Sequence, residues 1–453
     1  MSFPRYPKYK ASGVEWLGDV PEHWHLDRMK WSTRSCKNGI WSDEAKQDEN
    51  DIPCVRVADF DRQRLRVELD EPTMRNVSAS ERVGRVLRQG DLLLEKSGGG
   101  EGQPVGCVVL YDDPKAAVCS NFVAKVEVAP GMNSSFWRYL HAAAYSVRLN
   151  TRSIKQTSGI QNLDQQQYLD EIAAFPSEIE QTKIASFLDR ETSKIDGLVG
   201  EQRRLMELLK EKRQAVISHA VTKGLNPHAP LKPSGIEWLG DVPEHWRLIR
   251  LRHACSHIFL GLTTTVDYVD EGGVPLVRAL NINGGVLDLS EVKFISETQH
   301  RSLTKRNRAI RGDVLLSKSG SIGTAAVVDS DVEFSIYESI FALRARPELL
   351  TSRYLLQLLR SQACLSQYSA SLVGMGVGHL NMSDIVEVWA ALPPLDEQEQ
   401  IAKVIEDQTA RFDALTAEAE RGIELLQERR TALISAAVTG QIDVRGLVAT
   451  EAA

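Results

Sequence analysis

The 453-residue sequence contains only six cysteines, and no two of them form a Cys-x-x-Cys pair. This spacing favours thiols that act as small core residues in a reducing compartment over a disulfide framework. No apolar run approaches the roughly 20 residues needed to cross a bilayer. The opening residues MSFPRYPKYK contain no apolar segment of the signal-peptide type. The sequence therefore predicts a soluble cytoplasmic protein with no membrane partner.

The sequence also lacks a strong excess of charge of either sign. It has 54 basic and 61 acidic residues, a formal charge of −7, and its 25% charged and 42% hydrophobic content is typical of globular proteins. An acidic total argues at first against a partner as acidic as DNA. Residues 394–453, however, hold 12 acidic and 6 basic residues, which leaves −1 for residues 1–393. The charge therefore does not exclude DNA as a partner of the rest of the chain.

The most informative feature that is present is an internal repeat. Residues 12–24 read SGVEWLGDVPEHW and residues 234–246 read SGIEWLGDVPEHW, so only one of 13 positions differs. The same offset of 222 relates GDLLLEKSG at 90–98 to GDVLLSKSG at 312–320, and farther along the offset becomes 217. We infer that the chain contains two copies of one unit and that the second copy is five residues shorter.

Each copy begins with a region of mixed secondary structure, at 1–176 and 226–393. Short runs rich in Val and Leu, such as DLLLEK and FVAKVEV, are separated by Gly, Pro and Asp, which predicts strands joined by turns. One short helix is predicted in each copy, over 137–147 and 353–362. The predicted fold class is mixed α+β, with two globular domains.

Each copy ends in a long helix, predicted at 177–225 and 394–440, with a tail at 441–453. Apolar residues recur at intervals of three, four and seven, which is typical of a helix with one apolar stripe. The predicted stripes are Ile184, Leu188, Ile195, Leu198, Leu205, Leu209 and Val216 in the first helix, and Ile401, Ile405, Phe412, Leu415, Leu426 and Leu433 in the second. Such long helices need a partner for their stripe. We expect them to form an antiparallel coiled coil that separates two domains related by pseudo-two-fold symmetry.

Motifs that carry chemistry are scarce. The glycine-rich GGGEGQPVG at 98–106 lacks the Lys-Ser/Thr ending of a phosphate-binding loop. Two groups have metal-ligand side chains, Asp288, Glu291 and Lys293 in one and His253, Cys255 and His257 in the other. Neither group recurs in the other copy, and neither has the further ligands that a metal site needs. We expect no catalytic residue, no metal and no cofactor in this chain.

Taken together, these motifs resemble the specificity subunit of type I restriction–modification enzymes. The duplicated SGxEWLGDVPEHW element, the GD(L/V)LLxKSG strand and the EQxxIA helix start carry the resemblance over about residues 10–440. It implies two target-recognition domains, each reading one half of a bipartite target in double-stranded DNA, and a coiled coil that sets the spacer. It also implies that two methyltransferase (modification) subunits dock on the helices, and that restriction subunits join the full complex.

Basic, loop-like stretches next to Ser, Thr, Asn and Gln are expected to contact the DNA, because these side chains anchor phosphates and read base edges. The candidates in the first copy are Arg148, Arg152, Lys155, Gln156, Thr157, Ser158 and Asn162. The candidates in the second copy are Thr263, Thr264, Thr265, Lys305, Arg306, Arg308, His379 and Asn381. A solvated charged surface is the alternative interpretation of these clusters.

Features shared by both copies are expected to serve phosphate binding or the fold instead of sequence choice. Lys96-Ser97 and Lys318-Ser319 are one such pair of matching positions. The shared tryptophans Trp16, Trp24, Trp238 and Trp246 are expected to pack where each domain meets the long helices.

Three functions stay open at this point. The first is a DNA-specificity subunit without a catalytic site. The second is a self-sufficient nuclease or methyltransferase, which needs a catalytic constellation that the sequence does not display. The third is a scaffold that binds only proteins, which leaves the basic stretches unexplained.

Overall fold

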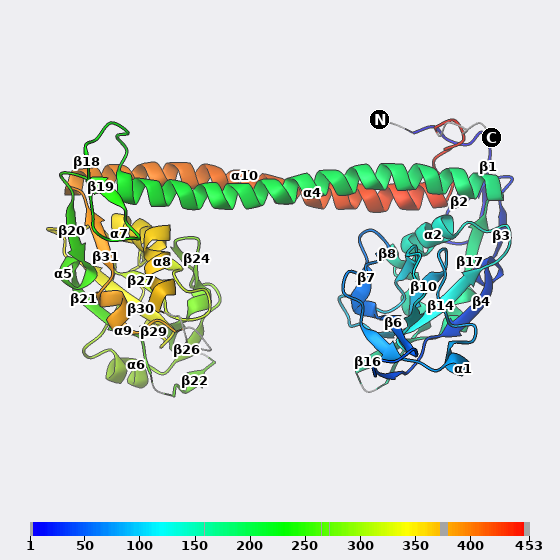
Figure 1. The fold of residues 1–453 in the computed structure, drawn as a ribbon, viewed down its shortest axis with the longest axis horizontal. Coiled ribbons are helices and arrows are strands. Elements are labelled where there is room, and N and C mark those ends of the chain that lie inside the picture. The colour runs from blue at the N-terminus through cyan, green and yellow to red at the C-terminus, as the bar shows by residue number, and fades with distance from the viewer. Residues whose placement is uncertain (1–2, 158, 264, 271, 372–378, 448–453) are drawn as a thin grey trace. The chain divides into compact units, whose positions relative to one another are not determined.

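The computed structural model describes residues 3–157, 159–263, 265–270, 272–371 and 379–447. The chain forms two compact units, one made of Met1–Gln202 with Glu420–Ala453 and the other of Arg203–Ala419. Each unit contains one mixed domain and one half of each of two long helices, α4 (Glu178–Lys223) and α10 (Leu395–Val438). Within each unit, the domain lies along one side of the helix pair (Figure 1). The expected mixed α+β class with two long helices is confirmed.

The domain of the first unit is built on a six-stranded sheet of order β4-β14-β10-β12-β8-β7. Its strands are β4 (Thr33–Asn38), β14 (Val123–Val128), β10 (Leu92–Glu95), β12 (Val108–Leu110), β8 (Arg66–Val67) and β7 (Phe60–Asp61). A second sheet comprises β13 (Val118–Cys119), β6 (Asp51–Val55), β9 (Met74–Asn76) and β5 (Asp43–Glu44). The remaining elements are β1 (Tyr9–Ala11), β2 (Asp19–Pro21), β3 (His25–Arg28), α1 (Ala79–Arg82), β11 (Ser97–Gly98), α2 (Ser134–Ser146), β15 (Ile154–Thr157), β16 (Ile160–Leu163), α3 (Gln165–Leu169) and β17 (Ile172–Phe175). Strand β10 is buried along its whole length, as its unbroken Leu run predicts for a central strand.

The domain of the second unit repeats this framework. Its sheets are β21-β30-β27-β28 and β22-β26-β23-β29. The strands are β21 (Cys255–Leu260), β30 (Ile340–Ala345), β27 (Val314–Ser317), β28 (Ala325–Val327), β22 (Tyr268–Val269), β26 (Lys293–Ile295), β23 (Val274–Val277) and β29 (Ser335–Ile336). The other elements are β18 (Leu231–Pro233), β19 (Asp241–Pro243), β20 (Arg247–Arg250), α5 (Leu251–Ala254), β24 (Ile282–Asn283), β25 (Val286–Leu287), α6 (Glu297–Leu303), α7 (Ser352–Arg360), α8 (Gln362–Ser371), α9 (Met382–Val386) and β31 (Trp389–Leu392). The central strands pair alike in both copies, since β10 and β27 each lie between two antiparallel neighbours.

The aspartate of the repeated Gly-Asp motif explains why that motif occurs in both copies. Asp91 and Asp313 are buried, and each accepts a hydrogen bond from the backbone N–H three residues earlier, at 2.7 and 3.0 Å. Each is also paired with a basic residue from the neighbouring strand, Lys125 at 3.0 Å in one copy and Arg344 at 2.8 Å in the other. A buried carboxylate needs such partners. The motif therefore holds the turn before the central strand and is part of the fold.

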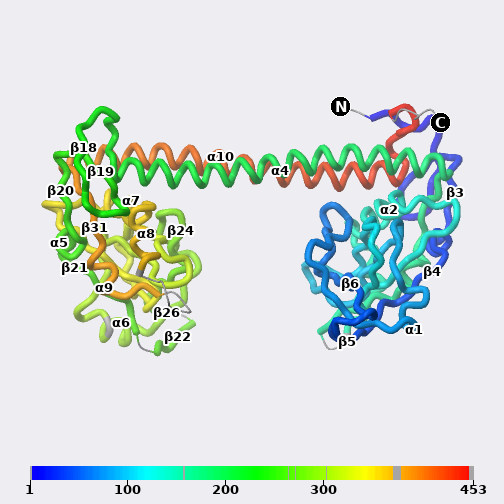
Figure 2. Tube along the Cα trace, in the orientation of Figure 1, coloured from blue at the N-terminus to red at the C-terminus, as the bar shows by residue number. Residues whose placement is uncertain are grey.

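The long helices pair antiparallel inside each unit. In the first unit, Arg430 of α10 forms an ion pair with Asp196 of α4 at 3.2 Å. In the second unit, Arg213 of α4 pairs with Asp413 of α10. Figure 2 shows the two helices side by side, with the beginning of one next to the end of the other within each unit.

The buried stripe of these helices differs from the predicted stripe in its phase. Val199, next to the predicted Leu198, is buried, whereas Leu198 and Leu205 are 46% and 41% exposed. In the same way, Leu415 is exposed on α10. Residues three and four apart satisfy a heptad pattern in more than one phase, and the partner helix selects which of these phases is buried. The predicted positions Leu198, Leu205 and Leu415 are therefore wrong as core residues.

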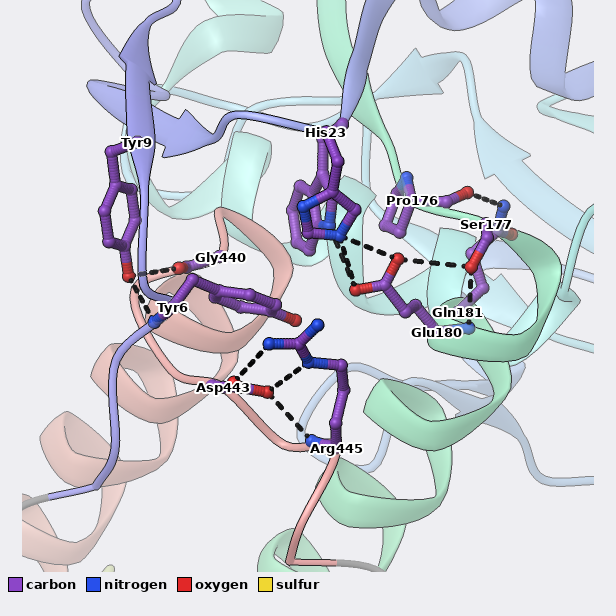
Figure 3. A network of polar contacts seen from close by, with 11 residues as sticks. Tyr6, Tyr9, His23, Pro176, Ser177, Glu180, Gln181, Gly440, Asp443 and Arg445 are labelled. Atoms are coloured by element: carbon purple, nitrogen blue, oxygen red, sulfur yellow. Dashed lines mark hydrogen bonds and ion pairs between the residues drawn. The ribbon is translucent and has the colours of Figure 1, made fainter.

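A tryptophan of the repeated element links the start of one long helix to the end of the other in the first unit. Trp24 is 1% exposed, and its Nε1 donates to Glu180 Oε1, in the first turn of α4, at 3.4 Å. His23 Nε2 lies 3.0 Å from the same carboxylate (Figure 3). Gly440 ends α10 with a φ of +77°, and a Cβ there would overlap Pro21 and approach Trp24 to 3.1 Å. A glycine is therefore required where α10 ends.

The second unit contains the same junction, built from the other ends of the helices. Trp246 is 1% exposed and donates from Nε1 to Glu397 Oε1, near the start of α10, at 3.2 Å. His245 Nε2 lies 2.8 Å from Glu397 Oε2. Gly224, with a φ of +74°, ends α4, and a Cβ there would lie 3.2 Å from Trp246. The expected position of these two tryptophans, where each domain meets the helices, is confirmed.

The other two shared tryptophans lie at the edges of these junctions. Trp16 is partly buried and donates from Nε1 to the carbonyl of Ile172 at 3.2 Å. Trp238, at the matching position, is 40% exposed. These two side chains therefore contribute less buried surface than Trp24 and Trp246.

The segment before the first domain packs against the segment after α10. The hydroxyl of Tyr9 donates to the carbonyl of Gly440 at 3.0 Å, and the guanidinium of Arg445 stacks over the ring of Tyr6 (Figure 3). Asp443 accepts from Arg445 at 2.7 Å, and its hydrogen bonds to Arg445 hold the pKa of its carboxyl below the usual value. The contacts of Tyr6 and Tyr9 with the segment after α10 thus complete the first junction.

Each domain is also fixed to its long helix by an arginine. In the first unit, the buried Arg138 of α2 donates to Asp189 of α4 at 2.5 Å, and Tyr139 donates to the same carboxylate at 2.8 Å. In the second unit, Arg353 of α7 pairs with Glu399 of α10 at 3.1 Å. These contacts and the tryptophan junctions position the domain on the helix pair within each unit.

A buried histidine makes the stability of the first unit depend on pH. His141 of α2 is buried beside Tyr168, with its Nδ1 2.9 Å from the tyrosine oxygen, and burial lowers its pKa to about 4. Its pKa in the unfolded chain is about 6.5. Because protonation favours the unfolded state, the stability that this group contributes is present above pH 6.5 and is lost as pH falls towards 4.

We expect the first unit to lose about 2 kcal/mol of unfolding free energy from this group between pH 7.5 and pH 5. The matched variant is His141→Leu, because alignment of the helix N-caps Asn133 and Thr351 places Leu359 at the corresponding position of the second copy. Urea unfolding of both proteins at the two pH values measures the effect. An equal pH dependence in the wild type and the variant would show that His141 is not the titrating group.

Five of the six cysteines are buried, and all six are free thiols. Among the described residues, no helix combines the length and the apolarity needed to cross a bilayer.

Candidate nucleic-acid interface

A cavity of about 640 Å³ opens where several strands of the first domain end. Its lining includes Ile40, Trp41, Ser42, Asp43, Glu44, Arg56, Arg75, Ser97, Gly98, Asn121 and Phe122. Trp41 is 80% exposed, although it follows a buried isoleucine. An exposed indole beside arginine, amide and hydroxyl groups provides a surface for stacking together with hydrogen-bonding groups for a polar ligand.

A cavity of about 670 Å³ occupies the same place in the second domain. It is lined by Arg278, Ala279, Leu280, Lys318, Ser319, Gly320, Ser321, Tyr337, Glu338, Ser339 and His379. Arg278 corresponds to Arg56, and Ser319-Gly320 corresponds to Ser97-Gly98, by the same offset of 222 that relates the repeated motifs. We call these two sites the twin cavities.

The backbone confirms that the twin cavities are equivalent. The N–H of Lys96 donates to the carbonyl of Phe122 at 2.9 Å, and the N–H of Lys318 donates to the carbonyl of Ser339 at 2.7 Å. Val123 and Ile340 close the same turn in the two copies with hydrogen bonds of 2.9 and 3.0 Å to the residue three positions earlier. The loop after the central strand is therefore held against the same turn in both domains.

A close backbone contact completes this shared frame. A Cβ at Gly39 would overlap the carbonyl oxygen of Ser120, and a Cβ at Gly261 would overlap the carbonyl oxygen of Tyr337. Only glycine permits this approach between the end of a strand and the turn. The second residue after this glycine is placed differently in the two copies: Trp41 lines the first of the twin cavities, whereas Thr263 lines a separate cavity of the second domain.

The charge in the twin cavities differs although the frame is shared. In the first domain, Arg56 forms an ion pair with Asp59 at 3.2 Å. In the second domain, Asn281 takes the place of that aspartate and accepts from the backbone N–H of Arg278 at 2.9 Å. The Nε of Arg278 is buried and, among the described residues, has no hydrogen-bond partner. Among the described residues, Arg278 therefore lacks the aspartate partner that Arg56 has.

Several of the predicted contact residues of the first copy lie on the hairpin formed by β15 and β16, next to the first cavity. Lys155 and Gln156 lie on β15, and Asn162 lies on the paired strand β16, which extends to β11 at the cavity wall. The hydroxyl of Ser97 donates to Asn162 Oδ1 at 2.6 Å. Lys155 is paired with Asp164 at 2.7 Å, so part of its charge is already neutralised. The hairpin therefore brings Asn162 into contact with the cavity wall at Ser97, whereas Lys155 and Gln156 are not among the residues that line the cavity.

The remaining candidates of the first copy lie before or at the tip of this hairpin. Arg148 is exposed, has a φ of +59° and donates to the carbonyl of Gly102 at 3.4 Å. Arg152 is exposed, and its carbonyl accepts from Gln167 at 3.0 Å. The backbone of Thr157 ends β15, and Ser158 lies outside the described residues.

The candidates of the second copy divide between two places. His379 lines the second cavity. It corresponds to Asn162 of the first copy, because the residue after His379 donates its N–H to the carbonyl of Lys318 at 3.2 Å, and the residue after Asn162 donates its N–H to the carbonyl of Lys96 at 2.8 Å. Asn381 precedes helix α9, and its N–H donates to an aspartate of the first helical turn at 2.7 Å. Asn381 therefore has a helix-starting role in the fold.

Thr263 and the 304–308 segment meet at a separate cavity of about 580 Å³ in the second domain. Thr304 and Asn307 line it together with Thr263, and His257 Nε2 lies 3.0 Å from Asn307 Oδ1. Of the basic residues in this segment, Lys305 and Arg306 are exposed, and Arg308 is paired with Glu333. In the threonine run, the carbonyl of Thr265 accepts a hydrogen bond from Gln299 at 3.3 Å. Thr264 lies outside the described residues.

Sequence reasoning missed Trp41, Arg56 and Asn121 in the first cavity, and Arg278 and Glu338 in the second. The signal that identifies them is the repeat itself. The 222 offset applied to Trp41 leads to Thr263, and the 217 offset applied to Asn121 leads to Glu338. Aligning the copies at the diverging loops, and not only at the matching motifs, would have placed these residues side by side.

Within the part of the chain that the structure describes, no three His, Cys, Asp or Glu side chains are grouped so that they could hold a metal ion. Cys255, one of the metal-type residues noted in the sequence, is 3% exposed in the core, and burial raises the pKa of its thiol to about 12. The arrangement of the twin cavities is suited to binding and recognition.

Comparison with protein families gives one matching model. Residues 263–425 match the type I restriction modification DNA specificity domain. The match includes most of the second domain and more than half of α10, and it covers all the residues that line the second of the twin cavities.

Comparison with characterised proteins points the same way. The chain is similar to the EcoBI specificity subunit of Escherichia coli, with 22% identity over 333 residues, which are 72% of this chain and 69% of that protein. It is also similar to the MjaVIII specificity subunit of Methanocaldococcus jannaschii, with 23% identity over 313 residues, or 67% of this chain and 70% of that protein.

In fold, the chain is similar to a solved structure from a type I restriction–modification system. The TM-score is 0.70 at 18% identity, and the alignment covers 93% of this chain and 99% of the other.

Proposed function

We propose that this chain, which belongs to the specificity subunits of type I restriction–modification systems, reads a bipartite DNA target with its two domains. The observation that carries the proposal is the pair of twin cavities, which have one frame and two different linings. A duplicated site with different contact residues suits two half-sites of different sequence in one duplex. The predicted contact residues of both copies belong to this proposal.

In this proposal the basic groups hold the DNA backbone, and the polar groups that differ between the copies read the bases. Lys305 and Arg306 are exposed and form no ion pair among the described residues, so they are available for phosphates. Arg148 and Arg152 of the first copy are exposed as well. Phosphate contacts fix the orientation of a protein on DNA, and contacts to base edges choose the sequence.

We propose that the helix pair sets the spacer between the half-sites. Helices α4 and α10 have 46 and 44 residues and pass from one unit to the other. Four residues inserted into each, between 202 and 203 and between 419 and 420, add about 6 Å. We expect a spacer about two base pairs longer with unchanged half-sites, measured by sequencing the methylated sites. Altered half-site sequences would contradict this role of the helices.

The partners in this proposal are two methyltransferase (modification) subunits, with restriction subunits in the full complex. We propose that exposed leucines of the long helices form the docking surface, since clustered exposed apolar side chains mark protein contact sites. They are Leu198 and Leu425 in the first unit and Leu205, Leu208 and Leu415 in the second. The chain itself supplies recognition, and catalysis belongs to the partners, in the cytoplasm.

The direct test is selection of bound sequences from a pool of random duplex DNA by the full chain, alone and with its modification subunits. We expect two short constant blocks separated by a fixed number of variable bases. A parallel incubation of the chain alone with duplex DNA, Mg²⁺ and S-adenosylmethionine should give neither cleavage nor methylation. Enrichment of no sequence, or turnover by the chain alone, would overturn the proposal.

A further inference from the structure

The turn that closes each cavity presents one side chain at its tip on a fixed backbone. In the first domain the turn is Ser120–Asn121–Phe122, and in the second it is Tyr337–Glu338–Ser339. Both are held at two points, by the hydrogen bond that closes the turn and by the hydrogen bond from the lysine of the loop beside it. A side chain on such a turn is pre-organised for recognition, which lowers the entropic cost of each contact.

The tip residue differs in charge between the copies. Glu338 is exposed, lines the cavity together with Arg278 and Lys318, and forms no ion pair among the described residues. The matching residue in the first copy is the neutral Asn121, which lines the first cavity. The frame therefore tolerates either side chain, and the fold does not require a carboxylate at this position.

A free carboxylate on a DNA-binding surface can interact favourably with a base edge but not with a phosphate. Phosphates repel it, so it does not contribute to backbone affinity. In the major groove it accepts a hydrogen bond from the N4 amino group of cytosine, whereas asparagine at the same place makes a bidentate pair with adenine. The basic groups next to it, Arg278 and Lys318, supply the attraction to phosphate that the carboxylate opposes.

We propose that the tip of this turn is the base-selecting position of each domain, with Glu338 reading cytosine in one half-site and Asn121 reading adenine in the other. His379 lines the second cavity together with Glu338, and the matching Asn162 contacts Ser97 of the first cavity. The proposal rests on the function proposed above and adds to it the residue and the base. The shared Arg56 and Arg278 hold phosphate in this arrangement.

The experiment exchanges the tip residues between the domains. Glu338→Asn gives the second domain the residue of the first, and Asn121→Glu gives the first domain the residue of the second. Each full-length variant, assembled with its modification subunits, selects from the random duplex pool. Glu338→Gln is included because it removes the charge and keeps the length. Glu291→Asn is the control, since it removes an exposed acid of the same domain outside the cavity.

We expect Glu338→Asn to exchange cytosine for adenine at one position of one half-site, with a change in preference of about tenfold to a hundredfold. The other half-site and the spacer stay unchanged. Asn121→Glu should produce the reverse exchange in the other half-site, and Glu338→Gln should lose the preference for cytosine. Glu291→Asn should select the wild-type sequence.

The outcomes separate this inference from the function on which it rests. If the wild-type complex selects a bipartite sequence and the exchanged variants select the same one, the tip residue does not read the base and the inference fails. A uniform loss of affinity for all sequences would assign the residue to backbone contact or folding, which also overturns it. If the wild-type complex itself selects no sequence, the proposed function fails.

Discussion

Replacement of Trp246 by alanine is expected to lower the unfolding free energy of the second unit by about 3–5 kcal/mol, the usual cost of deleting a buried aromatic side chain. The indole lies between Gly224 at the end of α4 and Glu397 at the start of α10, and it is 1% exposed. Its removal leaves a cavity at the junction. It also removes one of the hydrogen bonds that satisfy the Glu397 carboxylate, whose remaining partner is His245 at 2.8 Å.

Trp24→Ala is expected to have an effect of the same size in the first unit, because the junction there has the same parts. Trp24 contacts Gly440 and donates to Glu180. Hydrogen bonds from His23 and Trp24 outweigh the effect of burial and hold the pKa of the Glu180 carboxyl below its usual value. This carboxylate is therefore ionised at neutral pH and depends on its partners.

Hydrogen exchange followed segment by segment, together with urea unfolding, measures these losses. Each variant should lose protection in its own unit, at the ends of α4 and α10 that meet there. Trp238→Ala is the matched control, because that tryptophan is 40% exposed and should cause a smaller loss. Equal losses from Trp238 and Trp246 would show that the junction is not held by the buried indole.

Exchange of residues 226–393 for the corresponding domain of a relative with another target is expected to change one half-site completely and to leave the other intact. Affinity for the original target should fall by a factor of about 10³ or more, the usual ratio between specific and non-specific DNA binding. The reason is that all contacts of one cavity are replaced while the frame, the helices and the first domain stay the same.

Mapping of the methylated sites in DNA exposed to the assembled complex measures this result. Residues 234–246 lie inside the exchanged segment, so the relative must carry a matching SGIEWLGDVPEHW element for the tryptophan junction to be kept. A change in both half-sites would mean that the two domains do not read independently. An unchanged target would mean that the second domain does not read DNA sequence.

Local sequence patterns predicted some strands and helices correctly and others only in part. The Leu-rich and Val-rich runs at 91–96 and 122–128 became β10 and β14, and the helix predicted over 137–147 is α2, shifted towards the N-terminus. The run VRVADF at 55–60 has the composition of a strand, but β6 ends at Val55, a 3-10 turn covers Val57–Asp59, and β7 begins at Phe60. Its side chains have strand-like character, but the backbone bends because β6 and β7 belong to different sheets.

The candidate site was predicted only in part. Asn162 on β16 contacts Ser97 of the first cavity, and His379 lines the second. Trp41, Arg56, Asn121, Arg278 and Glu338 were missed. They stand in no motif, because the strand end, the loop and the turn that meet at each cavity lie far apart in the chain.

The sequence by itself determined the duplication, the mixed domains, the long helices and the resemblance to a family of DNA-specificity subunits, since each is carried by periodicity or by repeated motifs. The tertiary structure alone decided which face of each helix is buried and which side chains share a cavity. A heptad pattern allows more than one phase until a partner helix covers one of them. In the same way, the difference in charge between Asn121 and Glu338 can be interpreted only because the fold places these two residues on matching turns.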